Sequence, residues 1–333
     1  MLLRLWPEET KVSFMQFRIF AVILSGAALL ASAALLGTRG LNLGIDFAGG
    51  SVIEIVEPEG VTPADVRRIV ETADITGDIV INSARSTGEN ATNLEVIRFK
   101  TQEPREGENA EAAQQNANNR VRAALAETLG DPTLPPEEAE EALIRSSAAV
   151  GPKVSGELFR AGITALVTAL ALMMVYISFR FQWQYAVGAV SALFHDVFLT
   201  MGIFALTGFE FNLATIAALL TIVGYSMNDT VIVFDRVREE ARKYKKLELS
   251  KVVDLAVNAT MSRTLLTSGT TLLALLSIFL FGGDVLRGMS FGLIFGVIVG
   301  TYSSIFVAST VLLFLGIDRG DKPKREVEGF TGV

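Results

Sequence analysis

The chain has 333 residues, of which 50% are hydrophobic and 20% are charged, with a mean hydropathy of +0.43 and a formal net charge of −7. This composition excludes a disordered chain and an ordinary soluble domain. The absence of cysteine excludes disulfide frameworks, thiolate zinc sites and thiol nucleophiles, and the single His195 leaves little material for a histidine metal site or triad. We therefore expect a membrane protein without a catalytic centre, metal site or cofactor.

Six apolar runs are long enough to cross a bilayer as helices. The hydrocarbon core is about 30 Å thick and needs about 20 apolar residues in a helix, because lipid offers the backbone no hydrogen-bond partner. The first run contains Ala31-Ser32-Ala33, which resembles a signal-peptidase site, but it continues through Leu36, so we expect an uncleaved anchor. The predicted spans are residues 19–37, 158–179, 185–206, 211–234, 264–281 and 289–315.

Lysine and arginine in the short connections predict the orientation of these spans. Sixteen such residues lie on one side, in the flank 1–18, at Arg180, in the segment 235–263 and in the tail 316–333, whereas the two short connections opposite contain Arg287 alone. We therefore expect both termini to be cytoplasmic and residues 38–157 to be exported. The basic segment 235–263 is predicted as a cytoplasmic loop, either a solvated helical stretch or a contact with anionic lipid or an acidic partner surface.

The exported residues 38–157 have the pattern of a small α+β domain. Strand-like "LNLGIDFAGGSVIEIV", "DIVINSA" and "NLEVIRF" alternate with helix-like "TPADVRRIVETA" and a helix in the region 109–129, and a last short helix and strand follow. This order is that of the split βαβ, or ferredoxin-like, fold. The junctions of the domain with the membrane predict hinges at Gly37, Gly40, Gly151 and Pro152.

An aspartate lies inside the fourth predicted span. A charged side chain at bilayer depth costs at least ~3 kcal/mol, so it persists mainly where it faces protein or water and has a partner. Asp229 lies about 27 Å along a helix from Phe211, and Arg263, at the start of the antiparallel fifth span, can reach a similar depth. The pair is either an ion-coupling site or a static interhelical contact that includes Asn228. Hydroxyls that could relay protons follow on the fifth span, among them Thr267 and Thr271.

His195 and Asp196 form a second polar pair, near the middle of the third span. Two interpretations stay open for this pair, a proton relay or gate and a structural polar contact. A metal site is disfavoured, because the chain has no second histidine.

Glycines recur at every fourth position of the sixth span and form one smooth stripe on a helix. Such a stripe lets another backbone approach closely, either within the chain or from another subunit. The stripe consists of Gly288, Gly292, Gly296 and Gly300.

Six motifs resemble the SecD/SecF family of protein-export membrane proteins, in particular its SecF members. "GIDFAGG" follows the first span, "VGP" precedes the second, "FHDV" lies in the third, "GYSMNDTVIVFDR" ends the fourth, "RTLLTSGTTL" opens the fifth and "GMSFGLIFGVIVGTYSSIF" lies in the sixth. The resemblance covers nearly the full chain. The polar stretch between Phe99 and Arg120 matches no family motif, which leaves the boundaries of the second helix of the exported domain open.

The resemblance implies one half of a transporter of the resistance-nodulation-division superfamily, with SecD as the other half. The pair is expected to use the proton-motive force to pull unfolded preprotein out of the SecYEG channel of the bacterial inner (plasma) membrane, after the ATP-dependent stage driven by SecA. YajC is a further candidate partner. The essential carboxylate of the family falls on Asp229 and its arginine on Arg263. No nucleotide-binding G-x-x-x-x-G-K-[ST] motif occurs, and we expect no nucleic-acid partner.

The residues around Asp229 fit more than one coupling ion. A carboxylate beside threonines and an asparagine can coordinate Na⁺ as well as exchange a proton, so the coupling ion is not assigned. Two alternative functions also remain, a proton-coupled small-molecule exporter half of the same superfamily and a purely structural subunit of the translocase.

Overall fold

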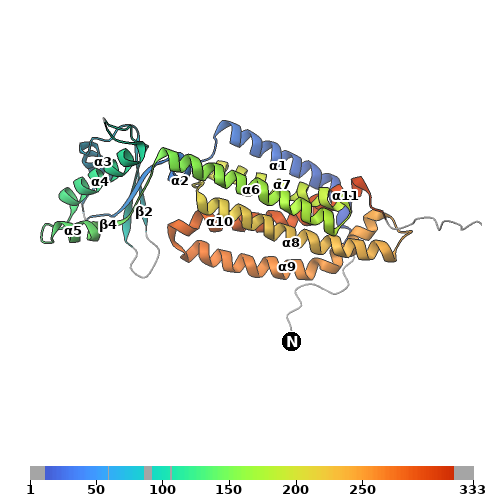
Figure 1. The fold of residues 1–333 in the computed structure, drawn as a ribbon. Coiled ribbons are helices and arrows are strands. Elements are labelled where there is room, and N and C mark those ends of the chain that lie inside the picture. The colour runs from blue at the N-terminus through green and yellow to red at the C-terminus, as the bar shows by residue number, and fades with distance from the viewer. Residues whose placement is uncertain (1–11, 59, 86–91, 106, 319–333) are drawn as a thin grey trace, which may run out of the picture.

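The computed structural model describes residues 12–58, 60–85, 92–105 and 107–318 of the chain. A bundle of long helices forms one part of the molecule, and a small α+β domain lies beyond one end of that bundle (Figure 1). Several of the basic residues that predict the orientation lie outside the described residues, namely Arg4, Lys11, Arg319, Lys322, Lys324 and Arg325.

Six helices within the described residues are long and apolar enough to span a bilayer, which confirms the predicted helical membrane fold. They are α1 (Arg18–Thr38) with the short η1 (Phe14–Phe17) before it, α6 (Pro152–Arg180), α7 (Trp183–Thr207), α8 (Leu213–Lys243), α9 (Leu249–Phe281), and α10 (Gly283–Ser303), which continues through the π-helical η2 (Ser304–Ala308) into α11 (Ser309–Leu315). The side chains of α7 and α8 are the most buried, whereas α1, α6 and α9 lie at the periphery. Polar groups such as Asp196 on α7 and Asp229 on α8 are therefore enclosed by the bundle.

The helices extend beyond the apolar runs that predict them. α8 continues to Lys243 and α9 begins at Leu249, so most of the segment 235–263, for which a solvated helical stretch was one interpretation, is helical. Hydropathy marks only the part of a helix that lipid surrounds, whereas the helix itself continues wherever polar side chains stabilise it. Here ion pairs one turn apart, from Arg236 to Glu240 and from Lys243 to Glu239, support the last turns of α8.

The α+β domain has a four-stranded antiparallel sheet in the order β2-β3-β1-β4, which confirms the predicted ferredoxin-like fold. Alternate side chains of the central strands, such as Ile53, Ile55 and Ile97, point to one face and pack against Val66 and Val121 of the helices. The elements are α2 (Ile45–Ala48), β1 (Gly50–Val56), α3 (Pro63–Thr72), β2 (Ile79–Arg85), β3 (Asn93–Phe99), α4 (Ala110–Leu129), α5 (Pro136–Leu143) and β4 (Ile144–Val150).

Local signals in the sequence fix where the helices of this domain begin. Thr62 precedes α3 and forms a capping box with Asp65, and Pro63 occupies the first helical position. The hydroxyl and backbone N–H of Thr62 hold the pKa of the Asp65 carboxyl below its ordinary value. Asn109 caps α4 by accepting a hydrogen bond from the N–H of Ala112, so this helix has a defined start inside the stretch that matches no family motif.

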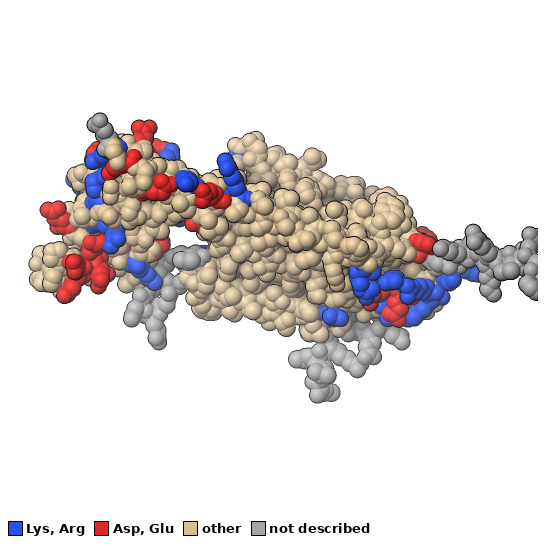
Figure 2. Space-filling model, viewed as in Figure 1, with Lys and Arg blue, Asp and Glu red and all other residues tan. Residues whose placement is uncertain are grey.

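Charged side chains gather at the two ends of the molecule, on the α+β domain and at the opposite end of the bundle, and the surface between them is almost free of charge (Figure 2). The opposite end carries a group of lysines and arginines, which belong to the end of α8, the connection 244–248 and the start of α9. An uncharged belt between two charged ends is the surface expected of a bundle that spans a bilayer.

Candidate functional site

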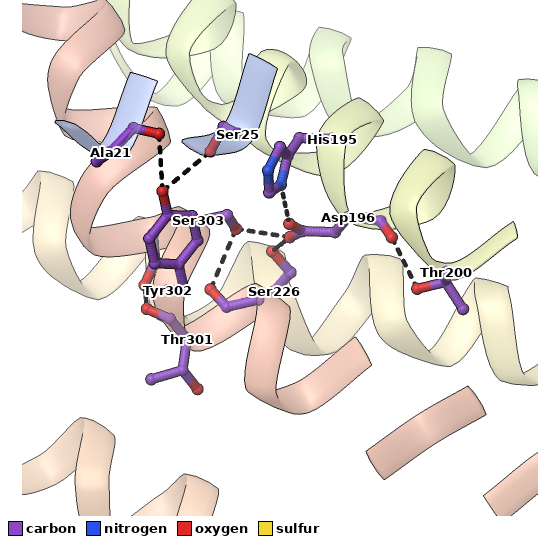
Figure 3. A network of polar contacts seen from close by, with 11 residues as sticks. Ala21, Ser25, His195, Asp196, Thr200, Ser226, Thr301, Tyr302 and Ser303 are labelled. Atoms are coloured by element: carbon purple, nitrogen blue, oxygen red, sulfur yellow. Dashed lines mark hydrogen bonds and ion pairs between the residues drawn. The ribbon is translucent and has the colours of Figure 1, made fainter. Parts of the chain in front are cut away.

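A buried carboxylate joins three helices at the centre of the bundle (Figure 3). Asp196 of α7 is completely buried, and its Oδ2 accepts hydrogen bonds from the hydroxyls of Ser226 on α8, at 2.5 Å, and Ser303 on α10, at 2.7 Å. Its Oδ1 lies 2.9 Å from Nδ1 of His195. Both carboxylate oxygens therefore have partners, as a buried charge requires.

The polar cluster continues from Asp196 towards α1. The ring of Tyr302 lies 6.1 Å from that of His195, and its hydroxyl donates to the carbonyl of Ala21 at 2.9 Å and lies 3.0 Å from Oγ of Ser25. The π-helical turn η2 begins two residues later, which interrupts the regular helical ladder beside the cluster. The predicted His195–Asp196 pair thus exists, and the structure adds Ser226, Ser303 and Tyr302, which the sequence did not indicate.

His195 also borders an apolar cavity of about 630 Å³ between α1, α7 and the η2–α11 segment. Its Nε2 is buried and has no hydrogen-bond partner among the described residues. One ring nitrogen of the histidine is therefore fixed by Asp196, and the other is left without a protein partner.

Asp229 of α8 lies one turn further along the helix than Ser226, and its surroundings differ from those of Asp196. The residue is 1% exposed, yet its Oδ2 has no hydrogen-bond partner among the described residues. The hydroxyls of Thr230 and of Thr264 on α9 are buried and unpartnered in the same way. A buried carboxylate oxygen without a donor is rare in a folded protein.

The structure does not join Asp229 and Arg263 in an ion pair. Arg263 is exposed on α9, near enough to act electrostatically on Asp229, but no ion pair of 4.0 Å or less links these two described residues. Asn228 is exposed on the outer face of α8. The hydroxyl of Thr267 donates to the carbonyl of Arg263 within its own helix, and Thr271 is half-buried. The predicted residues therefore share a neighbourhood without forming one hydrogen-bonded set.

The glycine stripe of α10 packs within the chain. A Cβ at Gly292 would lie 3.0 Å from the ring of Phe204 on α7, one at Gly296 would lie 2.3 Å from the side chain of Ile222 on α8, and one at Gly300 would lie 3.2 Å from Ser226. Gly288 lies near the carbonyl of Glu210. The close approach at Gly300 lets Ser226 reach between the helices towards Asp196.

The predicted hinge residues have different surroundings at the two junctions. Gly40 has a positive φ of +71° after α1, and Gly37 lies within α1 with open space around it. Gly151 is the N-cap residue of α6 and packs against Glu111, and Pro152 is the first residue of that helix.

The "GIDFAGG" segment, residues 44–50, forms a junction with the membrane bundle. The sequence pattern predicted a strand here, but Ile45–Ala48 form the short helix α2 and β1 begins only at Gly50. Gly44 approaches so closely that a Cβ would lie 3.1 Å from that of Asn212, and Asp46 accepts a hydrogen bond from the N–H of Leu213 at 2.9 Å. Gly49 and Gly50 have positive φ, and a Cβ at Gly50 would lie 2.6 Å from the carbonyl of Phe99. The signal in the sequence that could have indicated this junction is the group of glycines around Asp46, because glycine permits a close approach between backbone segments.

Comparison with known proteins identifies the relatives of the chain. Residues 135–318 match the family "Protein export membrane protein SecD/SecF, C-terminal", and residues 34–56 match "SecD/SecF GG Motif". Proteins named protein translocase subunit SecF are similar over nearly their whole length: that of Cereibacter sphaeroides is 43% identical over 99% of this chain and 97% of the relative, and that of Rhodobacter capsulatus is 42% identical over 98% and 96%.

The fold is also similar to a solved structure. The crystal structure of SecDF, a translocon-associated membrane protein from Thermus thermophilus, has a TM-score of 0.75 and 30% sequence identity to this chain. The match covers 93% of this chain and 39% of that longer chain. A SecDF structure described as a super-membrane-facing form matches the same share of both chains with a TM-score of 0.64.

Proposed function

Because the chain belongs to the SecD/SecF family of protein-export membrane proteins, we propose that it is a half-transporter that couples an ion gradient to the late stage of protein export. Its solved neighbour SecDF is described as translocon-associated, and this chain spans only 39% of that protein. The remaining part of such an assembly would come from a SecD subunit. SecYEG, YajC and the unfolded preprotein are the further partners that this function requires.

One observation carries the proposal, namely the contrast between the two buried carboxylates. Asp196 has a partner on each oxygen, so its hydrogen-bonding capacity serves to hold α7, α8 and α10 together. Asp229 is equally buried, but within the described part of the chain its Oδ2 has no hydrogen-bond partner, and the charge of Arg263 acts on it without an ion pair. A carboxylate left free in this way can exchange an ion without first breaking a structural hydrogen bond. We assign the coupling role to Asp229 and a structural role to Asp196.

The composition of the exposed face beside Asp229 supports the proposal that a partner subunit contacts it within the membrane. From residue 214 to residue 234 of α8, the exposed positions are small or polar, namely Ala217, Thr221, Gly224 and Asn228. Arg263 and Thr270 are exposed on the neighbouring α9. Polar side chains and an arginine are costly against lipid, whereas small residues let another helix approach. We therefore place the SecD half against the face formed by these α8 and α9 residues.

The charge distribution supports the orientation that this function needs. The lysines and arginines at the end of the bundle far from the α+β domain fit the cytoplasmic side of a bacterial inner membrane (Figure 2). The α+β domain then faces the periplasm, where the preprotein emerges, and both termini are cytoplasmic.

The test is export by membrane vesicles that contain the assembled complex with Asp229→Asn, which keeps the shape of the side chain and removes its ability to carry a proton. We expect normal abundance of the complex, normal ATP-driven early translocation and loss of the gradient-stimulated completion of export. Asp235→Asn is the matched control, since Asp235 is an exposed acid on the same helix. Collapsing the proton and sodium gradients separately identifies the ion.

Two results would contradict the coupling role. Normal abundance with normal stimulation would show that the negative charge of Asp229 is dispensable. Low abundance of the complex alone would favour a purely structural subunit, because it would show that the fold itself requires the Asp229 carboxylate.

A further inference from the structure

The connection between α7 and α8 is held by the segment that leads from α1 into the α+β domain. The backbone N–H of Gly44 donates to the carbonyl of Phe211 at 2.9 Å, and the N–H of Phe211 donates to the carbonyl of Asn42 at 2.7 Å. The side chain of Asn42 donates to the carbonyl of Gly208 at 2.8 Å. The connection thus has hydrogen bonds at both ends to one short stretch of chain.

Asp46 makes the contact that reaches α8 itself. Its Oδ2 accepts the hydrogen bond of the Leu213 N–H, and Leu213 is the first residue of α8. The first N–H groups of a helix have no partner inside the helix, and a carboxylate there also interacts favourably with the helix dipole. α8 has its own cap as well, because Asn212 accepts from the N–H of Thr215. Two side chains therefore cap the same helix, one local and one from a distant segment.

The segment that carries Asp46 is itself anchored on both sides. Phe47, next to Asp46, is buried and packs against Phe159 of α6 and Phe211. Three residues after Phe47 the chain enters β1, where Gly50 approaches the backbone of β3 too closely for a side chain. Arg98 of β3 forms an ion pair with Glu210 of the α7–α8 connection, so the sheet also contacts the connection directly.

We propose that Asp46 is a positioning residue that links α8, the helix of Asp229, to the α+β domain. This proposal rests on the proposed function, and it adds the route by which a change at Asp229 reaches the exported side. A displacement of α8 moves the N–H of Leu213 and with it the carboxylate of Asp46. Because Asp46 lies four residues before β1, the movement is transferred to the central strand of the sheet.

The first experiment compares two cap losses at the same helix end. Asp46→Ala removes the cap that comes from the domain, whereas Asn212→Ala removes the local cap and leaves the link intact. Asp46→Asn keeps an oxygen that can accept from Leu213. We expect Asp46→Ala to lose gradient-stimulated export in vesicles while gradient-driven ion flux through the complex stays. Asp46→Asn and Asn212→Ala should export normally.

A distance measurement tests the link independently of transport. The chain has no cysteine, so spin labels can be attached to single cysteines introduced at Glu138 in the α+β domain and at Lys246 at the far end of the bundle. In the purified complex, we expect pulsed electron paramagnetic resonance to give a narrow distance distribution for the parent protein, Asp46→Asn and Asn212→Ala, and a broadened one for Asp46→Ala.

A covalent link between positions 46 and 213 tests whether restoring the contact also restores export. In a variant that combines Asp46→Cys with Leu213→Cys, we expect export to be lost in the reduced state and restored by a short bifunctional thiol reagent. The cross-linking experiment also tests the link if Asp46→Ala accumulates poorly, because export by the same molecules is compared before and after cross-linking. Failure of the cross-link to restore export would overturn the proposal.

The remaining outcomes separate this proposal from the proposed function. Normal export and a narrow distance distribution in Asp46→Ala, or an equal loss in Asn212→Ala, would overturn the link. Loss of ion flux in Asp46→Ala would place Asp46 in the ion path and would also overturn it. Normal stimulation in Asp229→Asn, measured in parallel, would instead contradict the coupling role of Asp229, and the distance distributions would still decide whether the link exists.

Discussion

The two aspartates of the bundle differ in which of their oxygens have partners. Asp196 has hydrogen bonds with Ser226, Ser303 and His195, whereas a buried oxygen of Asp229 has no donor among the residues that the structure describes. In a membrane, where water is scarce, the first arrangement stabilises one packing of helices and the second leaves a group available for exchange. The structural alternative for the His195–Asp196 pair is thus the one that its hydrogen bonds favour.

Substitution of Asp196 tests this structural role. Asp196→Ala leaves the Ser226 hydroxyl and a ring nitrogen of His195 buried without a partner, and it leaves the Ser303 hydroxyl with the carbonyl of Gly300 alone, so we expect the stability of the complex to fall by about 2 to 5 kcal/mol. Asp196→Asn retains an acceptor for the serines and should assemble and export near normally. The measurements are thermal unfolding of the purified complex and gradient-stimulated export. An abundant but inactive Asp196→Asn would instead support a proton relay.

At the residue scale, the sequence predicted the polar groups better than their partners. Asp229, His195 and Asp196 stand out as charged or titratable residues within apolar runs, and their cost in lipid is a property of the sequence alone. The pairing of Asp196 with Ser226 and Ser303 depends on the rotation of three helices about their axes, which no pattern of hydropathy specifies. The missing contact between Asp229 and Arg263 has the same cause, because a similar depth does not imply a shared face.

At the scale of elements, the packing of α10 on α8 depends on glycine. Gly296→Ala would place a methyl group 2.3 Å from the side chain of Ile222, so the helices must separate, at a cost of about 1 to 3 kcal/mol. Gly26→Ala on α1 is the matched control, because a Cβ there meets no atom within 4 Å. We expect a lower melting temperature for the complex with Gly296→Ala only. An equal melting temperature in both variants would show that the contact is not tight.

The capping box of α3 gives a second prediction at this scale. Thr62→Ala removes the acceptor of the Asp65 N–H and should destabilise the start of α3 by about 1 kcal/mol, which corresponds to about fivefold faster hydrogen exchange there. The pKa of Asp65 lies below its ordinary value. The stability that the ionised Asp65 carboxylate contributes to α3 is therefore present above about pH 4, and it is lost as the pH falls through the folded-state pKa of Asp65. Exchange in α4 serves as the internal control, and unchanged exchange in α3 would contradict the role of the cap.

Secondary structure was predicted well where its signals are local. The order of strands and helices in the α+β domain follows from residue alternation and from caps such as Thr62 and Asn109. The end of α8 and the start of α9 lie outside the predicted spans, because hydropathy stops at the edge of the lipid whereas the helices do not. The junction of Asp46 with Leu213 joins residues far apart in the chain, so only the fold could show it.

At the scale of the whole molecule, the charged ends define the expected orientation in the membrane. A single cysteine can be introduced at Glu138, which is exposed in the α+β domain, or at Lys246, which is exposed in the connection between α8 and α9. Because the chain has no cysteine of its own, labelling by a thiol reagent then reports the accessibility of that one position. In intact cells with a permeabilised outer membrane, an impermeant thiol reagent should label the first variant and not the second. Labelling of both after disruption of the inner membrane is the control. The opposite pattern would reverse the orientation.

The exposed face of α8 and α9 leads to a prediction about assembly. Asn228 and Arg263 lie on this face at the depth of Asp229, whereas Leu30 lies on the outer side of α1 and is 74% exposed. Lipid suits the leucine, but it leaves the amide and the guanidinium without hydrogen-bond partners, so the assembled protein must cover them. A photoreactive cross-linker attached through Asn228→Cys should therefore join the chain to a SecD-like subunit within the membrane.

The same cross-linker attached through Leu30→Cys is the matched control, and it should react mainly with lipid. Co-purification in mild detergent supplies a second readout, because a bundle with an uncovered arginine should lose stability when its partner is removed. If the Leu30 position captured the partner and the Asn228 position did not, the SecD half would lie on the α1 side of the bundle. The face of Asn228 and Arg263 beside the buried Asp229 would then contact lipid rather than the other half, and the coupling role of Asp229 would have no protein on that side to act on.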